Sequence, residues 1–341
     1  MQKKIKTVLI IRSSAMGDVA MTAPVLAAMA ANNPQVKMIM LTRDFYEPFF
    51  DGITNLTIHN IDLAEKHKGI DGVYRLYKEL TASYKVDLVL DLNDKLYSRL
   101  LRLFFRFSGI TSLHINKGRK GKKELTRKKN KIMKELRSSI ARYQDVFVEA
   151  GFCVEVKSKL TPQERPIPMV IGPKHEKWIG VAPFAKHRGK MLPLSTIRKV
   201  IELIEANNHG VRVFIFGGGS AERMVAESIE AWFKSSFSII GKLTLRQELD
   251  LIGNLDVMLS MDSSAMHMSS LMGTPAVSIW GATHPYAGFL GLGQSVDDVV
   301  SIDLPCRPCS VYGHKPCHKG TYECLTTITA PMVYDKIKKY L

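Results

Sequence analysis

Apolar runs of strand length alternate with amphipathic helical stretches along almost the whole chain. The predicted strands of the first half read TVLIIR, VKMIMLT, NLTIHN, VDLVLDL and TSLHIN. The helical stretches between them read VAMTAPVLAAMAA, VYRLYKELTASY and SRLLRLFFRF, and a basic helix is predicted over 128–150. Because parallel strands need crossover connections, this alternation is typical of a parallel sheet covered by helices on both faces.

A proline-rich stretch, TPQERPIPMVIGPKH at 161–175, interrupts the pattern as an interdomain linker would. The alternation resumes with strands WIGVAPF, VRVFIFG, FSIIG, DVMLSMD and AVSIWG. We therefore predict an α/β fold of two doubly wound Rossmann-like domains facing each other across a cleft. The predicted parts are an N-terminal domain (1–160), a linker (161–176), a C-terminal domain with a cysteine-rich tail (177–328) and a closing C-terminal helix (329–341).

Three hydroxyl residues stand where helices of the second half should begin. Ser195, Ser220 and Thr244 are predicted N-caps, and Thr244 with Gln247 fits a capping box.

The net charge is +16, and much of the excess lies in the stretch NKGRKGKKELTRKKNKIMKELR at 116–137. Such charge favours an anionic partner: nucleic acid, a membrane surface or a phosphorylated substrate. A solvated loop and helix face remains an alternative. A noncatalytic RNA-binding protein would also explain the charge, but the chain lacks interleaved aromatics and a known RNA motif, so we expect no nucleic-acid partner.

The apolar runs are all shorter than the roughly 18–20 residues that span a bilayer, and the N-terminal run is too short for a signal peptide. We therefore predict a cytoplasmic protein. Five cysteines occur, and four of them, spaced C-x2-C-x7-C-x6-C, could supply thiolates to a structural zinc site: Cys306, Cys309, Cys317 and Cys324.

Chemistry is expected in the loops after the strands, because doubly wound sheets bind ligands at the carboxyl ends of their strands. The first such loop, SSAMGDVAM, carries Asp18, which is either a general base or a cap of the following helix. A nicotinamide enzyme would show G-x-G-x-x-G here, and strand 1 lacks it. The glycines at 217–219 follow a strand, but no acid for the ribose ends the next strand.

Two loops of the second half carry groups that suit a diphosphate. The segment VAPFAKHRGKMLP brings Lys186, His187, Arg188 and Lys190 to the end of a strand, although an ordinary solvated basic loop is an alternative. The segment MDSSAMH places Ser263 at a helix N-terminus, where N–H groups and the helix dipole favour phosphate.

Together these segments resemble a known family, the ADP-heptose:lipopolysaccharide heptosyltransferases of glycosyltransferase family nine, which have the GT-B fold. The resemblance covers nearly the whole chain. It is carried by IRSSAMGDVAMTAP, the K-x-x-P of Lys190 to Pro193, GGGSAER, GKLTLRQ and DSSAMHMSSLMGTPAVSIWGATHP.

The resemblance implies an inverting, metal-independent transfer of heptose from ADP-heptose to a phosphorylated lipopolysaccharide inner-core acceptor. The first domain would bind the acceptor, the second would bind the nucleotide sugar, and no cofactor would be required for catalysis. It also implies a monomer that is peripheral at the inner face of the cell membrane, where an anionic membrane surface would be a further partner. A GT-B enzyme with another nucleotide sugar or acceptor, or an epimerase of that fold, remains an alternative.

Residue roles follow from the same resemblance. Asp18 would be the general base, Lys190 would contact the diphosphate, and Glu222 and Leu243 would hold the ribose and cover the adenine. Around the transferred sugar and the phosphates the matching residues are Asp262, Ser263, Ser264 and His267. Cations that would bind the acceptor are Lys122, Lys123, Lys128 and Lys129, with Arg99, Arg102 and Arg106 as possible additions.

Two positions depart from the family pattern. Ser264 stands where the family's D-[ST]-G-x-x-H has glycine, and Lys190 is followed by MLP rather than x-W-P.

Overall fold

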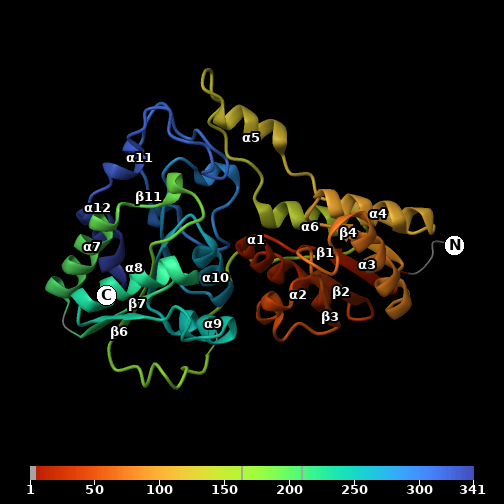
Figure 1. The fold of residues 1–341 in the computed structure, drawn as a ribbon, viewed down its shortest axis with the longest axis horizontal. Coiled ribbons are helices and arrows are strands. Elements are labelled where there is room, and N and C mark those ends of the chain that lie inside the picture. The colour runs from red at the N-terminus through yellow and green to blue at the C-terminus, as the bar shows by residue number, and fades with distance from the viewer. Residues whose placement is uncertain (1–4, 163, 209) are drawn as a thin grey trace. The chain divides into compact units, whose positions relative to one another are not determined.

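The computed structural model describes residues 5–162, 164–208 and 210–341. The chain divides into two compact units (Figure 1). Unit 1 consists of Met1–Lys117 and Ser139–Lys157, and unit 2 consists of Gly118–Ser138 and Ser158–Leu341. The chain thus contributes one early segment to unit 2, returns to unit 1, and then completes unit 2.

Unit 1 is built on a five-stranded parallel sheet with the order β3-β2-β1-β4-β5. The strands are β1 (Thr7–Ile11), β2 (Lys37–Thr42), β3 (Leu56–Asn60), β4 (Leu88–Asp91) and β5 (Thr111–His114). Its helices are α1 (Met16–Ala20), α2 (Ala23–Asn32), α3 (Gly69–Ser83), α4 (Leu96–Phe107) and α6 (Ser139–Glu149), with a 3₁₀ helix η1 (Asp44–Phe50).

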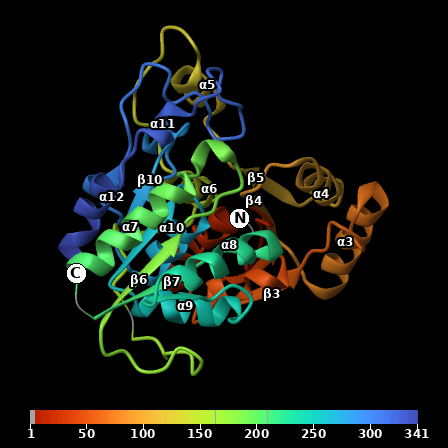
Figure 2. The same cartoon turned by 60° about the vertical axis from the view of Figure 1, so that its left-hand side comes forward.

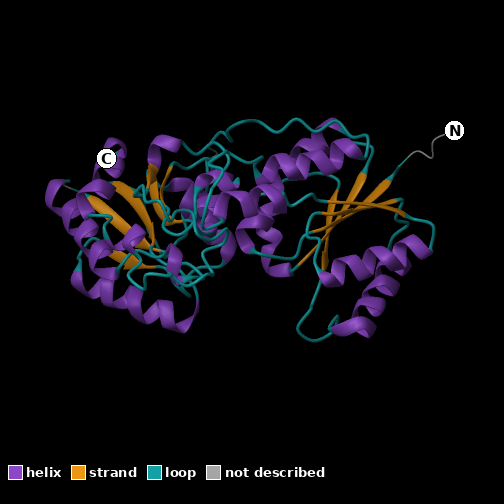
Figure 3. Cartoon of the chain, turned by 90° about the horizontal axis from the view of Figure 1, so that it is seen from above, coloured by secondary structure: helices purple, strands orange, loops and turns teal. Residues whose placement is uncertain are grey.

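The helices of unit 1 cover both faces of this sheet because its strands are apolar on both sides. Side chains alternate between the faces, so Leu9 and Ile11 of β1 lie in a core with Leu76 of α3 and Phe105 of α4. Helices α2 and α6 pack on each other. Figure 3 shows the two sheets, one in each unit, in orange.

Unit 2 is built on a six-stranded parallel sheet with the order β11-β10-β9-β6-β7-β8. The strands are β6 (Lys177–Ala182), β7 (Val211–Ile215), β8 (Ser236–Ser238), β9 (Val257–Met261), β10 (Ala276–Ile279) and β11 (Val299–Val300). Its helices are α5 (Arg119–Thr126), α7 (Leu194–Asn207), α8 (Gly219–Trp232), α9 (Leu245–Asn254), α10 (Ser264–Met272), α11 (Glu323–Thr326) and α12 (Ala330–Ile337). Short 3₁₀ helices are η2 (Arg188–Lys190), η3 (Pro285–Ala287), η4 (Val296–Asp298) and η5 (Lys338–Tyr340).

The core of unit 2 joins this sheet to its covering helices. Buried side chains of α7, such as Ile197 and Ile201, pack with Val333 of α12 and with strand residues such as Val181 and Leu259. The predicted closing helix is thereby part of the core. No helix among the described residues has the combination of length and apolar character that is needed to cross a bilayer.

The two parallel sheets confirm the predicted fold class, but the predicted helix over 128–150 needs correction. No helix runs over 128–150: α5 ends at Thr126, residues 127–138 form no helix or strand, and α6 begins at Ser139. A run of Lys and Arg between 127 and 134 explains this interruption, because like charges on neighbouring helical turns repel. Segment 118–138 belongs to unit 2, whereas the sequence led us to expect it in the first domain.

The predicted helix starts are right in one case of three. Thr244 caps α9: its side chain accepts the Gln247 N–H, and the Gln247 side-chain oxygen accepts the Thr244 N–H. Ser195 and Ser220 instead lie inside α7 and α8, one residue after each helix begins. The predicted linker, 161–176, lies in unit 2 without a helix or strand in its described part, and residue 163 falls outside the described residues.

Candidate functional site

The order of strands in unit 2 reverses between β6 and β9, and ligands of such sheets bind at this kind of reversal. Lys190 ends the loop that follows β6, and Asp262 directly follows β9. Their side chains form an ion pair, with 2.9 Å between Lys190 Nζ and Asp262 Oδ2. The Lys190 side chain is 17% exposed and that of Asp262 only 5%, so the ion pair is largely buried at the carboxyl ends of the strands.

Helix α10 begins beside this pair. Ser263 occupies the N-cap position with extended backbone, and Ser264 is the first helical residue. The Ser263 hydroxyl lies 3.2 Å from the Ser260 hydroxyl. The side chains of Ser263 and Ser264 are half-buried. The first N–H groups of a helix have no partner within the helix, and such an end suits an anion. The phosphate role predicted for Lys190, Ser263 and Ser264 stays a prediction.

The cysteine-rich tail supports the Lys190 loop. A Cβ at Gly313, whose φ is +76°, would lie 2.5 Å from Lys190 Cγ, so glycine lets the tail backbone pass against the lysine side chain. The His187 and His314 rings are 6.1 Å apart, and Arg188 lies over the Tyr322 ring. Burial, and then the neighbouring charges of Lys186 and Lys190, lower the pKa of His187.

Arg307 fixes the loop after β10 from inside the same tail. Its guanidinium is buried and donates to the backbone oxygens of Trp280, Gly281 and Thr283 at 2.9, 2.6 and 3.0 Å. It also donates to the Ile302 oxygen. Through Arg307 the tail thus has a structural role: it holds the backbone that lies next to η2.

The described residues do not support the zinc site that the cysteine spacing suggested. No group of three or more His, Cys, Asp or Glu side chains in that part of the chain could hold a metal ion. Cys324 is buried in the hydrophobic core of unit 2, where burial raises the pKa of its thiol to about 11. Cys324 thus packs as a small apolar side chain.

The residues expected at the nucleoside lie in α8 and in the loop before α9. Glu222, in the first turn of α8, accepts the Gly218 N–H at 2.8 Å through Oε2. Leu243 lies half-buried just before α9. His267 lies within α10, half-buried. The roles proposed for these three residues stay predictions.

In unit 1, Asp18 lies in α1 at the carboxyl end of β1. Its Oδ2 forms an ion pair with Arg12 at 2.5 Å, and it also accepts the Ala15 N–H at 3.4 Å. The second contact is long, so helix capping is the weaker of the two functions visible here. The Asp18 side chain is 32% exposed, which leaves it accessible to a ligand.

Arg12 is fixed on several sides. It is 9% exposed, its NH1 donates to the Leu92 oxygen at 2.5 Å, and its guanidinium lies 5.5 Å from the centre of the Tyr143 ring. Burial opposes its charge, but Tyr143 and Asp18 raise the pKa of Arg12 above its ordinary value. The Tyr143 hydroxyl in turn donates to the Asp18 backbone oxygen at 3.4 Å, so α6 also positions α1.

Two acids after β4 bind the arginines of α4. Arg102 Nε lies 3.0 Å from the buried Asp91 carboxylate, and Arg99 Nε lies 2.8 Å from Asp94. These arginines therefore hold the loop after β4, although they were predicted as additions to an acceptor surface. Arg106, in the last turn of α4, is exposed.

The four predicted acceptor lysines do not share one environment. Lys123, Lys128 and Lys129 are exposed, but Lys122 is buried, 4.4 Å from the centre of the Phe289 ring and 5.8 Å from that of Tyr312. Figures 1 and 2 show α5 beside the α11 end of unit 2. Lys122 anchors α5 by cation–π contact, so it is not a surface cation.

Sequence reasoning missed Arg12 and Arg307. Arg12 stands at the end of a strand next to the proposed base, and that position was a signal for it. Arg307 lies between Cys306 and Cys309, and the spacing of these cysteines suggested a metal site rather than a structural arginine.

Comparison with known proteins adds the family. The family model described as "Glycosyltransferase family 9 (heptosyltransferase)" matches residues 73–319. The chain is 24% identical over 315 residues to the lipopolysaccharide core heptosyltransferase OpsX of Haemophilus influenzae, across 87% of this chain and 84% of that protein. It is 27% identical over 131 residues to lipooligosaccharide heptosyltransferase 2 of Campylobacter jejuni, a match that spans 37% of this chain and only 40% of that relative.

Solved structures share the fold. A glycosyl transferase of family 9 from Veillonella parvula has a TM-score of 0.74 at 15% identity, covering 100% of this chain and 98% of its own. The E. coli ADP-heptose LPS heptosyltransferase II has 0.69 at 17%, covering 98% of each chain. E. coli heptosyltransferase WaaC, solved with ADP, has 0.67 at 17%, covering 98% of this chain and 100% of its own. These likenesses agree with the predicted GT-B fold.

Proposed function

Because this chain belongs to glycosyltransferase family 9, the heptosyltransferase family, we propose that it transfers heptose from ADP-heptose to a phosphorylated lipopolysaccharide inner-core acceptor. Unit 2 binds the donor and unit 1 supplies the base. The relatives' names support this choice, since they include lipopolysaccharide and lipooligosaccharide heptosyltransferases and one structure solved with ADP.

One observation carries the proposal: the Lys190 ammonium and the start of α10 lie together at the strand reversal of unit 2, joined by the Lys190–Asp262 ion pair. A cation beside the first N–H groups of a helix suits a diphosphate that gains negative charge as it leaves. The half-buried hydroxyls of Ser263 and Ser264 can donate to the same oxygens.

The proposed reaction inverts the anomeric carbon. Asp18 accepts the proton of the acceptor hydroxyl as that oxygen forms a bond to the anomeric carbon, and the bond from this carbon to the diphosphate oxygen breaks on the opposite face. ADP leaves with the electron pair, stabilised by Lys190 and by the α10 N-terminus. Arg12 holds the Asp18 carboxylate in place through the 2.5 Å contact.

A panel of nucleotide sugars tests the donor. ADP-heptose should raise the melting temperature of the whole chain more than ADP-glucose, UDP-glucose or GDP-mannose at equal concentration, because the native state gains stability from the ligand it binds best. Lys190→Ala should reduce the shift. Equal or greater stabilisation by a UDP-sugar would refute the ADP-heptose assignment and favour another enzyme of this fold.

Product analysis tests the reaction. With ADP-heptose and a phosphorylated core glycolipid, we expect ADP release together with a glycolipid heavier by one heptose, of inverted anomeric configuration, and unchanged turnover in excess EDTA. Donor conversion to an isomeric nucleotide sugar without acceptor would instead identify an epimerase, and retained configuration would refute the inverting mechanism.

A further inference from the structure

Helix α4 of unit 1 exposes three large apolar side chains: Leu96 at 85%, Leu103 at 43% and Phe107 at 78%. These residues are seven and then four positions apart in the chain, so they lie on one face of the helix. The buried side chains of Leu101 and Phe105 point from the opposite face into the core of unit 1. Helix α4 therefore has two apolar faces, and only the inner one is buried.

Helix α3 extends the exposed apolar surface. It packs against α4, and Figure 2 shows the two helices next to each other. The Tyr74 ring of α3 is 47% exposed and its centre lies 5.4 Å from that of Phe104, while Ile70, one turn earlier, is 71% exposed. Helix α3 adds no net charge, because its two acids are balanced by Arg75 and Lys78.

Positive charge flanks the outer face of α4. Arg99 and Arg106 each follow a residue of that face by three positions, and both are exposed. The 12 residues of α4 include no Asp or Glu. Asp94, just before the helix, is paired with Arg99 at 2.8 Å and with Arg102 at 3.4 Å, so its charge is compensated. Leu and Phe on one face with arginine beside them are typical of helices that lie in a membrane interface.

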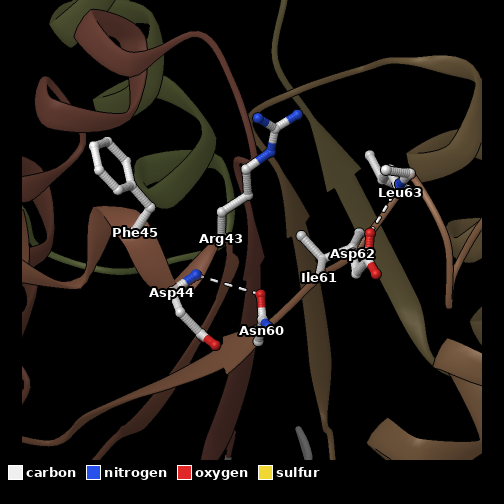
Figure 4. A pocket seen from close by; sticks show the side chains of 8 residues that line it. Arg43, Asp44, Phe45, Asn60, Ile61, Asp62 and Leu63 are labelled. Carbon is white, nitrogen blue, oxygen red and sulfur yellow. Dashed lines mark hydrogen bonds between the residues drawn. The ribbon is translucent and has the colours of Figure 1, made fainter. Parts of the chain in front are cut away.

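Phe45, which is also exposed, at 59%, has different surroundings from Phe107. It lines a pocket of ≈ 370 Å³ at the ends of β2 and β3, together with Arg43, Asp44 and Asp62 (Figure 4). Two carboxylates and one guanidinium do not favour an anionic partner, and a hollow wall does not match a flat surface. Phe45 is therefore a suitable control for Phe107.

The outer face of α4 suits a bilayer better than a protein. A stable protein interface buries about 800 Å² on each partner, more than three side chains on a helix roughly 18 Å long provide. Two copies of the chain that met through this face would repel each other, since each carries a net charge of +16. A bilayer with anionic lipids has the opposite charge and takes up single apolar side chains at its surface.

We propose that the outer face of α4 docks on an anionic lipid bilayer, with Leu96, Leu103 and Phe107 inserted and Arg106 at the lipid phosphates. This inference goes beyond the proposed function, because it depends on neither the donor nor the candidate base. It also separates two kinds of membrane contact. The exposed lysines of segment 118–138 attract the surface by charge, which salt screens, whereas α4 holds unit 1 on the surface by apolar insertion, which salt does not screen.

Co-sedimentation of the full chain with vesicles of equal parts phosphatidylglycerol and phosphatidylcholine tests the docking. The double variant Leu96→Gln/Phe107→Gln should weaken vesicle affinity about 100-fold, because each side chain withdrawn from lipid costs about a factor of 10. This ratio to the wild type should persist at about 0.5 M salt, where charges are screened. The matched control Phe45→Gln/Val148→Gln changes one exposed aromatic and one exposed aliphatic side chain elsewhere in unit 1, and it should bind like the wild type.

A second variant, Phe107→Trp, reports insertion while it keeps an apolar ring on α4. When vesicles are added, its fluorescence should move to shorter wavelength by more than that of the wild type, and brominated lipids should quench it. Phe45→Trp should show neither effect. Emission of the Phe107→Trp variant that stays unchanged on vesicles would overturn the insertion.

Two further outcomes decide between this docking and its alternatives. Unchanged vesicle affinity of Leu96→Gln/Phe107→Gln would overturn the proposal, and so would a wild-type dimer in analytical ultracentrifugation that this variant converts to monomer. The ADP-heptose thermal shift should be the same in this variant as in the wild type. Failure of the docking would therefore leave the donor assignment intact, and absence of ADP-heptose binding would leave the docking intact.

Discussion

Lys190 and Asp262, which follow different strands of the same sheet, are each other's ion-pair partner at 2.9 Å. Both residues were predicted to touch the donor, and the structure shows that their ion pair joins the loop after β6 to the loop after β9. If the predicted roles hold, a single substitution at either residue should change stability as well as catalysis, and the two effects can be separated.

A double-mutant cycle separates them. Lys190→Met leaves the buried Asp262 carboxylate without its cation, so the free energy of unfolding should fall by up to about 3 kcal/mol. Asp262→Asn should cost less, and the double variant should regain part of the loss while donor affinity stays weak. Chemical denaturation and donor titration of all four proteins measure this. Additive stability effects would show that the ion pair contributes nothing.

Asp18→Asn isolates the proposed proton transfer. The amide is nearly isosteric and can still accept from Ala15 and Arg12, so melting temperature and donor affinity should stay close to wild type. General-base assistance contributes about 10²–10⁴-fold, and kcat should fall by roughly that factor. The measurement is single-turnover transfer, in which product release does not limit the rate. A variant that keeps more than about a tenth of the wild-type rate would show that Asp18 is not the general base and only caps α1.

Arg12 should act through Asp18. Arg12→Gln removes the cation 2.5 Å from the carboxylate, so the acidic side of the kcat/KM profile should move to higher pH and kcat should fall about 10-fold or more. Arg12→Lys keeps the charge and should restore the profile in part. A lower rate with an unshifted pH profile in both variants would mean that Arg12 only supports the fold. Arg75→Gln, at an exposed position of α3, controls for the loss of one positive charge.

Segment 118–138 should bind anionic membranes through its exposed lysines only. Charge reversal of Lys123, Lys128 and Lys129 should weaken binding to phosphatidylglycerol vesicles at least about 100-fold at low salt, because each cation near such a surface contributes about 1 kcal/mol. The difference should shrink as salt screens the charges. Lys122→Met is the matched control: vesicle binding should persist, while packing against Phe289 is lost. Vesicle binding that survives charge reversal would show that these lysines do not bind the membrane.

Glu248 should make stability depend on pH. Burial raises the pKa of this carboxyl to about 7, against about 4.3 in an unfolded chain. Between these values the native state binds more protons than the unfolded state, so the free energy of unfolding should fall as pH rises from about 4 to 7. Glu248→Gln should flatten this part of the profile and stabilise the protein at pH 8 by no more than about 3 kcal/mol. Denaturation curves at several pH values test this prediction. If Glu248→Gln leaves the slope of the unfolding free energy against pH unchanged, another group causes the pH dependence.

Much of the fold could be read from local pattern. The alternation of apolar strands and amphipathic helices predicts two parallel sheets, because burial on both faces imposes that pattern on each short segment. The Thr244 capping box and the polar turn at Ser263 are likewise local, and both occupy the helix starts where the sequence predicts them. The sequence also predicts that Asp18, Lys190 and Asp262 follow strand ends, which they do.

Only tertiary structure decided which of these groups meet. Nothing local indicates that Lys190 pairs with Asp262, that Arg12 holds Asp18, or that Lys122 is buried against Phe289. Each of these contacts joins residues from different elements, and their burial depends on how the strands are ordered and where the tail returns. Periodicity records which side of an element is buried but not what lies opposite, so composition and spacing could suggest a zinc site where packing instead buries Cys324 in the core.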